Sequence, residues 1–293
     1  MERIDKIVYG DNQFFGINHR SQDKAEQLAE RFSDIKEIFR TYDVAYDCGV
    51  RAIMLNSNEK ASAITDYFRQ NKSKFQDVRW YPSIPYPHKY ANMVAEKGIF
   101  GTLNEVIMKN SGAFGTLKMI GGGAMAAMNK DAIKMLQLLI DAEVAMFKGL
   151  DVKVIFLQNV ITDLLLGYQI KDVFQGYCDH IRKRYNAIPG FITVNLPYLS
   201  NKLKEWNIEE VVICSSINKI GFSMNPSLEA YLEVLSKNDP SKYQMMAMST
   251  LASGAIKPQE AFDFINRLNI QSVVFGASSE KNIKNSMGMI DLK

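Results

Sequence analysis

The sequence has few cysteines and few histidines, and these two shortages exclude several kinds of site. The three cysteines, Cys48, Cys178 and Cys214, lie far apart and form no Cys-x-x-Cys pair. They indicate small buried residues in a reducing compartment rather than a disulfide framework. The three histidines have neither His-x-His nor His-x-x-x-His spacing. No metal site is therefore predicted.

The chain also lacks an excess of one charge and a long apolar run. Its 35 basic and 32 acidic residues are interspersed, and the net charge of +3 is too small to favour nucleic-acid binding. No apolar run reaches the ~18 residues of a membrane span. The first residues, Met1 to Lys6, lack the apolar region of a secretion signal. We expect a cytoplasmic protein whose partner is a small-molecule substrate, with no binding to nucleic acid or membrane.

What is present is a regular alternation of strand and helix patterns. Short β-rich apolar runs recur at roughly 30-residue intervals, with helical periodicity between them. With 293 residues and no linker, the chain matches the ~250 residues of one large α/β barrel. We therefore expect residues 1–293 to form a single domain, a (β/α)8 TIM barrel.

Nine strands are predicted where a barrel needs eight, so residues 117–123, which include most of the candidate strand 116–120, are assigned to a long third insertion. The predicted strands cover residues 6–10, 51–55, 79–86, 116–120, 152–158, 189–195, 210–216, 243–249 and 272–275. The predicted helices cover residues 22–47, 91–110, 130–147, 201–206, 228–235, 258–265 and 280–286. Residues 159–163 and 196–197 are expected to be loops that follow strands.

The C-terminal part of the chain contains two short loop motifs. Thr250-Leu-Ala-Ser-Gly254 and Phe275-Gly-Ala-Ser-Ser279 each follow a predicted strand and precede a predicted helix. They resemble the closing loops of the aldo-keto reductase barrel, where the second loop precedes a helix that binds the cofactor phosphate. The resemblance implies an aldo-keto reductase-like barrel with NADP(H) as the candidate cofactor. The implied cofactor-binding residues are Ser249, Gly276, Ser278, Ser279, Lys281 and Asn282.

The start of the helix predicted for residues 280–286 has an alternative explanation that involves no phosphate. Glu280 already complements the helix dipole, so the sequence there needs no bound phosphate.

The catalytic tetrad of the reductase family has no counterpart in this sequence. The family carries an aspartate and a tyrosine after the second strand, a lysine after the third and a histidine after the fourth. The matching places hold Asn56, the Glu59–Lys60 region, Ser83 and Gln158, and the next tyrosine, Tyr67, falls in a helix. The resemblance therefore implies a fold more strongly than a chemistry.

Polar residues follow most of the predicted strands. In a barrel the carboxyl ends of the strands form one mouth, where barrel enzymes place their chemistry. The alternative is that Asn, Ser and Asp serve there as loop formers and helix caps. The predicted substrate-binding residues are Asn12, Gln13, Asn56, Tyr86, Gln158, Asn159 and Asn218.

Three residues are predicted to be catalytic. His19 follows the first strand and suits proton transfer, although a surface loop would also explain it. Asp11 is a candidate acid or base. Lys219 lies just past a strand end, like the Schiff-base lysine of a class I aldolase-type barrel, or else is an ordinary surface lysine.

Three functions remain open from the sequence. The first is a diverged barrel enzyme for a small polar substrate, sugar-like or phosphorylated, of unresolved reaction type. The second is an NAD(P)H-dependent carbonyl oxidoreductase whose proton donor has moved to Tyr86 or His19. The third is a non-catalytic binding protein on a barrel scaffold.

Overall fold

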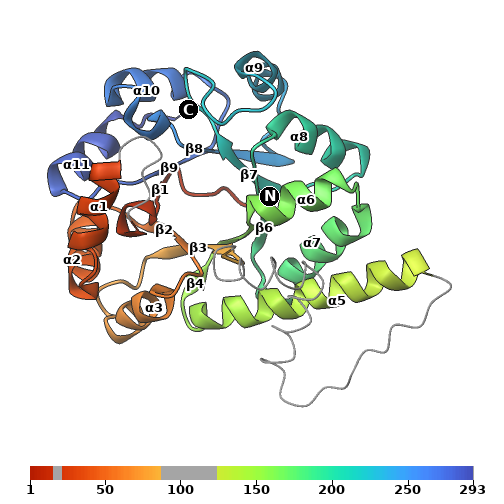
Figure 1. Ribbon diagram of the computed structural model, residues 1–293, viewed down its shortest axis with the longest axis horizontal. Helices are drawn as coiled ribbons and strands as arrows, with labels where there is room; N and C mark the ends of the chain where they lie inside the picture. Colours follow the sequence, from red (N-terminus) through yellow and green to blue (C-terminus); the bar gives the residue numbers. More distant parts are fainter. Residues whose placement is uncertain (16–21, 87–123, 293) are drawn as a thin grey trace.

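Parallel strands close into a ring in the computed structural model, which describes residues 1–15, 22–86 and 124–292 (Figure 1). The strands of this part are β1 (Ile7–Tyr9), β2 (Ala52–Asn56), β3 (Arg79–Ile84), β4 (Asp151–Val152), β5 (Val154–Leu157), β6 (Ile188–Thr193), β7 (Val211–Ser216), β8 (Tyr243–Met248) and β9 (Ser272–Phe275).

The nine segments make eight barrel strands, because β4 and β5 are one strand interrupted at Lys153. Both pair with β3, and the Lys153 N–H donates to the Trp80 carbonyl across the interruption at 2.9 Å. The ring closes at β1, where Tyr9 pairs with Ile53 of β2 on one side and with Phe275 of β9 on the other. The predicted TIM barrel is confirmed, and the eight strands close without residues 116–120, which lie outside the described residues.

Helices surround the barrel on the outside (Figure 1). They are α1 (Gln22–Arg31), α2 (Ile35–Asp47), α3 (Ala61–Gln70), α5 (Ala124–Val144), α6 (Asn159–Gly167), α7 (Lys171–Tyr185), α8 (Leu196–Glu205), α9 (Leu228–Ser236), α10 (Pro258–Ile265) and α11 (Glu280–Met289). Short 3₁₀ turns are η1 (Asn12–Phe15), η3 (Ala145–Phe147) and η4 (Ala252–Gly254). Within the described ranges, none of these helices combines the length and the apolar character that crossing a bilayer requires.

The helix predicted for residues 22–47 is wrong as one element, because the chain breaks it into α1 and α2. Phe32, at the break, is fully buried and packs edge-on against Phe14 with ring centroids 5.0 Å apart. Asp34 then begins α2 by accepting a hydrogen bond from the Lys36 N–H at 2.9 Å. The apolar spacing continues across the break, which explains why the pattern suggested a single helix.

Two predicted loops are also wrong, because both are the first turns of helices. Residues 159–163 belong to α6, which begins after the extended Gln158. Residues 196–197 belong to α8, where the Asn195 side chain caps the Tyr198 N–H at 3.2 Å. Pro197 is tolerated there because the first turn needs no N–H donor. The C-terminal units, by contrast, follow the predicted order through β8, α10, β9 and α11.

Alternate residues of each strand point into the barrel and fill it. The interior is a buried apolar cluster distinct from the core between barrel and helices; its members are Ile4, Val8, Ala52, Met54, Tyr81, Val154, Phe156, Ile192, Val212, Cys214 and Met246. Because side chains alternate with period two, the residues two positions past Met54, Tyr81 and Phe156 continue inward at the mouth. These residues are Asn56, Ser83 and Gln158.

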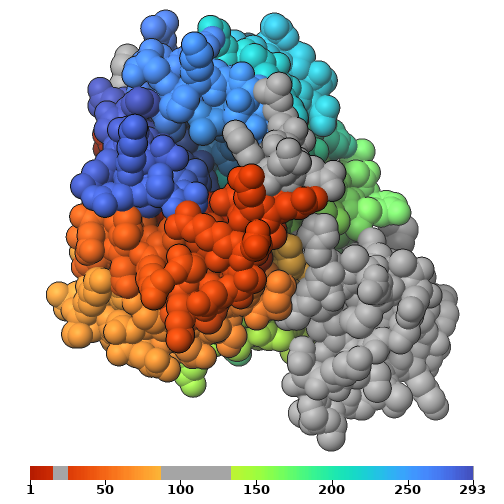
Figure 2. Space-filling model, turned by 60° about the vertical axis from the view of Figure 1, so that its left-hand side comes forward, coloured from red at the N-terminus to blue at the C-terminus, as the bar shows by residue number. Residues whose placement is uncertain are grey.

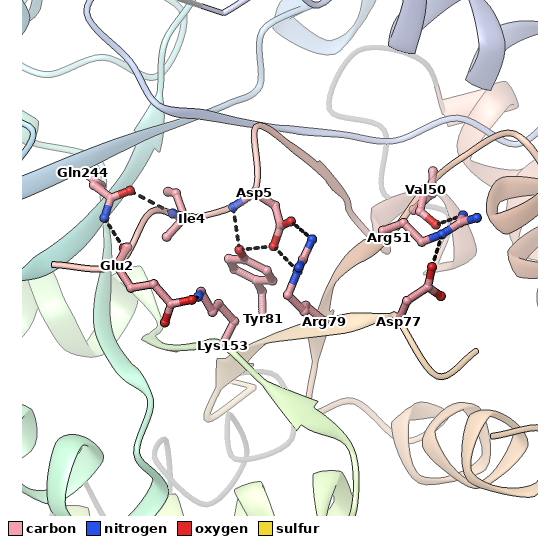
Figure 3. A network of polar contacts seen from close by, with 10 residues as sticks. All are labelled: Glu2, Ile4, Asp5, Val50, Arg51, Asp77, Arg79, Tyr81, Lys153 and Gln244. Atoms are coloured by element: carbon pink, nitrogen blue, oxygen red, sulfur yellow. Dashed lines mark hydrogen bonds and ion pairs between the residues drawn. The ribbon is translucent and has the colours of Figure 1, made fainter. Parts of the chain in front are cut away.

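The N-terminal segment closes the opposite end of the barrel (Figure 3). The Ile4 N–H donates to Gln244 Oε1 at 2.9 Å, and the Asp5 N–H donates to the Tyr81 hydroxyl at 2.9 Å. The Asp5 carboxylate also accepts from Arg79 Nε at 2.9 Å. Arg79, Tyr81 and Gln244 lie at the starts of β3 and β8, so this segment seals the amino ends of the strands, and the mouth at their carboxyl ends is the opposite end of the barrel.

Gly190→Ala is expected to destabilise the barrel, because Gly190 makes room for the Phe156 ring. A Cβ at Gly190 would lie 2.6 Å from Phe156 Cε1 and 2.9 Å from Val154 Cγ1, both in the packed interior. Overpacking of this kind costs about 1–3 kcal/mol, measurable by urea unfolding. Gly288→Ala is the control, since nothing lies within 4 Å of its added Cβ in α11. Equal effects of the two substitutions would contradict the prediction.

Candidate active site

Three polar side chains from three strand ends meet at the mouth. Asn56 ends β2, Gln158 follows β5, and Asp11 lies just past β1. β2 and β5 lie on opposite sides of β3, where Asn56 pairs with Ser83 and the neighbouring Ile84 pairs with Leu157. The ring closure of β1 against β2 brings Asp11 to the other side of Asn56. Sequence-distant residues therefore form one row across the mouth.

Hydrogen bonds join the row. Asp11 accepts from the Asn56 backbone N–H at 2.9 Å and from Asn56 Nδ2 at 2.7 Å. Asn58 Nδ2 adds a longer bond of 3.4 Å to the same carboxylate. On the far side, Gln158 Nε2 donates to Asn56 Oδ1. The Asn56 amide is thus oriented from both sides, which preorganises it for binding.

The Asp11 carboxyl has a perturbed proton affinity. It is 2% exposed, and burial raises its pKa from 3.8 to about 6, although the hydrogen bonds from Asn56 act in the opposite direction. In the described part of the chain no cation forms an ion pair with it. A buried carboxylate without a counter-charge costs stability, and such groups concentrate at functional sites.

Gln13 and Tyr86 lie near this row. Gln13 is 8% exposed; its Nε2 donates to the Gly10 carbonyl at 2.7 Å, and its Oε1 is buried against Gly276 without a partner among the described residues. The Tyr86 N–H donates to Ser57 Oγ at 3.0 Å. Burial raises the pKa of the Tyr86 phenol, and the charges of Glu59 and Asp11 raise it further. Asn12, in η1, is exposed.

Other predicted residues are placed apart from the row. Asn218 is fully buried and holds its own loop, since its side chain accepts from the Phe222 N–H and donates to the Phe222 carbonyl. Lys219 is half-exposed and pairs with Glu260 of α10 at 2.6 Å. Asn159 begins α6 and is half-buried. His19 lies outside the described residues, so its role stays a prediction.

Most of the predicted cofactor-binding residues lie between the end of β9 and the first turn of α11. The Ser278 carbonyl accepts from Arg31 of α1 at 2.9 Å, which ties the loop to a distant helix. Ser279 caps α11 by accepting from the Asn282 N–H at 3.4 Å. Lys281 and Asn282 are exposed in its first turn. A helix N-terminus with a nearby lysine suits an anion such as a phosphate.

Gly276 and Ser249 are the two other predicted cofactor-binding residues. Gly276 is exposed next to Gln13, and Ser249 follows β8 with a left-handed backbone, φ 53°. Figure 2 shows α1 and α2, in red to orange, beside α11, in dark blue, on one face of the molecule, and α2 contacts α11. The predicted cofactor-binding residues at the start of α11 therefore lie on the α1–α2 side of the barrel.

Two residues next to the row were not among the predicted binding residues. Asn58 contacts Asp11, and Ser57 accepts from the Tyr86 N–H. The signal was available, because Asn56-Ser-Asn58 places three polar residues directly after a strand. Which of them face the mouth depends on the path of the turn, which the spacing alone does not specify.

Comparison with known proteins places the fold. No protein-family model and no curated protein matches the sequence. A solved Pseudomonas aeruginosa protein, provisionally described as an aldo-keto reductase, matches with TM-score 0.56 and 8% identity over 98% of this chain and 90% of that one. An aldo-keto reductase from Bacillus halodurans, solved in its holo form, matches with TM-score 0.52 and 10% identity over 98% and 87%. The fold is that of the aldo-keto reductases.

A third solved structure gives the same result. A protein provisionally described as 2,5-diketo-D-gluconic acid reductase B has TM-score 0.55 and 9% identity, over 98% of this chain and 82% of its own. At such identities the match concerns the fold alone.

In this aldo-keto reductase-like barrel, the strand ends hold neutral side chains where the resemblance implies catalytic ones. Asn56 and Ser83 stand at the ends of β2 and β3, and Gln158 follows β5. Tyr67 is remote from the mouth: its ring stacks on Phe39 at 4.3 Å between α2 and α3, on the outside of the barrel. The strand ends of this barrel therefore carry polar groups that differ from the catalytic residues implied by the resemblance.

Asp11→Asn is expected to change the pH dependence of stability with a defined sign. Between pH 3.8 and about 6 the folded chain keeps a proton that the unfolded chain has released. Wild-type stability should therefore fall relative to Asp11→Asn as pH rises through this window, and the difference should be constant above it. The change is about 3 kcal/mol for a shift of about two pKa units.

Urea unfolding at pH 4.5 and 7.5 should show about 2 kcal/mol of this change, because part of the window lies below pH 4.5. Asp263→Asn, on the exposed side of α10, is the control for loss of a carboxylate. A stability difference between wild type and Asp11→Asn that is the same at both pH values would show that Asp11 titrates normally.

Proposed function

We propose that the chain is an enzyme for a small, uncharged substrate that carries hydroxyl and carbonyl groups, and that it performs acid–base chemistry at the Asp11 end of the mouth. The observation that carries this proposal is the hydrogen-bonded row of Gln158, Asn56 and Asp11. Such a substrate is sugar-like in character.

The amide of Asn56 supplies the argument for the substrate class. A primary amide offers two donors and two acceptor sites. Asp11 takes one donor and Gln158 occupies one acceptor site, so one of each remains. Asn56 is half-buried and therefore reachable from the mouth. A hydroxyl group, which both donates and accepts, complements this pair.

The carboxyl of Asp11 supplies the argument for acid–base chemistry. A group whose pKa is about 6 populates both protonation states near neutral pH, as efficient proton transfer requires. The raised pKa of Tyr86, in contrast, makes its phenol a poorer acid. This weighs against a reductase in which Tyr86 protonates the developing alkoxide.

A thermal-shift screen of neutral sugars, sugar alcohols and hydroxyaldehydes at pH 7.5 tests the proposal. We expect at least one of them to stabilise the wild-type chain. Asn56→Leu and Gln158→Leu should each weaken that ligand about tenfold or more, because each leaves polar groups unpaired. The Kd is measured by calorimetry.

The matched control is Gln259→Leu, an exposed glutamine that bonds Asp263 on α10. It should leave the Kd unchanged. The proposal fails if no compound binds, or if the ligand found binds equally well to all three variants.

A second candidate, an NAD(P)H-dependent oxidoreductase, is favoured by the capped start of α11. There Ser278, Ser279 and Lys281 combine helix N–H groups with a positive charge, a set that fits a cofactor phosphate. A bound nicotinamide cofactor would supply hydride. The neutral strand ends, Asn56, Ser83 and Gln158, do not supply the proton donor that such a reaction needs.

Calorimetric titration with NADPH and NADH decides on this candidate. It predicts a Kd near micromolar that weakens at least tenfold when Ser278, Ser279 and Lys281 are all changed to alanine, since each contributes a donor or charge at the helix start. Wild-type binding absent up to millimolar concentrations would eliminate nicotinamide chemistry. A triple variant that binds as tightly as wild type would place the cofactor elsewhere.

A further inference from the structure

Tyr42 of α2 has a hydroxyl whose position packing alone does not explain. Its side chain is 1% exposed, and its ring packs against Phe14, Phe68 and Tyr9 with centroids 5.0, 5.3 and 6.0 Å away. The hydroxyl is buried without a hydrogen-bond partner among the described residues. In an aromatic site of this kind phenylalanine would pack equally well and avoid the cost of a buried, unpaired hydroxyl, about 1–3 kcal/mol.

The ring of Tyr42 lies close to the segment that carries Asp11. Tyr9 and Phe14 flank Asp11 along the chain, and Tyr42 is wedged against both. The charge of Asp11 acts on the phenol and, together with burial, raises the pKa of Tyr42. The phenol is therefore neutral at any ordinary pH and can only act as a hydroxyl donor or acceptor.

The Asp11 carboxylate has capacity for one more donor. A carboxylate offers about four acceptor positions. Among the described residues, Oδ2 accepts from the Asn56 N–H and from Asn58 Nδ2, whereas Asn56 Nδ2 is the one donor to Oδ1. A fourth donor would complete the set.

We propose that the Tyr42 hydroxyl is that donor, acting on Asp11 Oδ1 through one buried water, and that Tyr42 is a positioning residue for the Asp11 carboxyl. The bond stabilises the ionised form, so it lowers the pKa of Asp11 and offsets part of the effect of burial. The proposal takes its catalytic meaning from the proposed function. The bond itself belongs to the substrate-free chain and can be tested without a substrate.

The charge of Asp11 raises the pKa of two phenols, Tyr42 and Tyr86, and both are neutral in the acid range. Glu59 and Lys60 adjoin Asn58 next to Asp11, and replacing Tyr42 by phenylalanine changes neither of these charges. A shift in the Asp11 midpoint on changing Tyr42 would therefore report on the hydroxyl rather than on a neighbouring charge.

The experiment is a pH titration of the ¹³C-labelled aspartate carboxyl resonances, with the Asp11 signal assigned by its loss in Asp11→Asn. Tyr42→Phe, which removes only the hydroxyl, is expected to raise the Asp11 midpoint by about one pH unit, because a hydrogen bond to the charged form is lost. Tyr177→Phe is the control: this buried phenol donates to the Ile155 and Gly190 carbonyls, away from Asp11, so the midpoint should not move.

A second measurement covers the case in which Tyr42→Phe does not fold. In wild-type chain grown with 3-fluorotyrosine, whose phenol is a stronger donor, the Asp11 midpoint should fall. An unchanged midpoint in Tyr42→Phe, or in the fluorinated chain if the variant does not fold, would overturn the proposal. A failed substrate screen would leave it standing, since the titration needs no ligand.

Discussion

The closure of the barrel at β1 is the constraint on which the rest depends. β1 is short, and its register with β2 is a single pair, Tyr9 with Ile53. Beyond that pair, the Asp11 carboxylate takes over the role of the strand by accepting the backbone N–H of Asn56. The side chain that forms the site is thus also the last bond that holds β1 to β2. The same residue therefore closes the barrel and carries the proposed acid–base role, which offsets the cost of burying its carboxylate.

The positions of the residues in the row follow from the periodicity of the strands. Strand periodicity fixes which positions point inward at the carboxyl ends, whatever residues occupy them. Here amides and a hydroxyl occupy the ends of β2, β3 and β5, while the carboxylate comes from the loop after β1. Because one fold can carry many chemistries, the activity of this barrel must be argued from these residues and not from the fold.

The sequence was sufficient for the barrel, because the alternation of strands and helices follows from periodic patterns. It could not pair Asp11 with Asn56, since their contact exists only when the ring closes between strands 1 and 2. It also could not separate Asn56 from Asn218. Both follow strands, yet one faces the mouth and the other bonds within its own loop. The break at Phe32 was hidden because apolar spacing persists through it.

The sealed end of the barrel has a consequence for the order of folding. Ile4 bonds to Gln244, 240 positions later, and Asp5 bonds to Arg79 and Tyr81. Arg79 and Tyr81 are made early, whereas the bond of Ile4 to Gln244 can form only after β8 has been made. Contacts between residues so far apart in sequence form late in folding, because closing a long loop costs conformational entropy. The beginning of the chain is the part that locks the finished barrel.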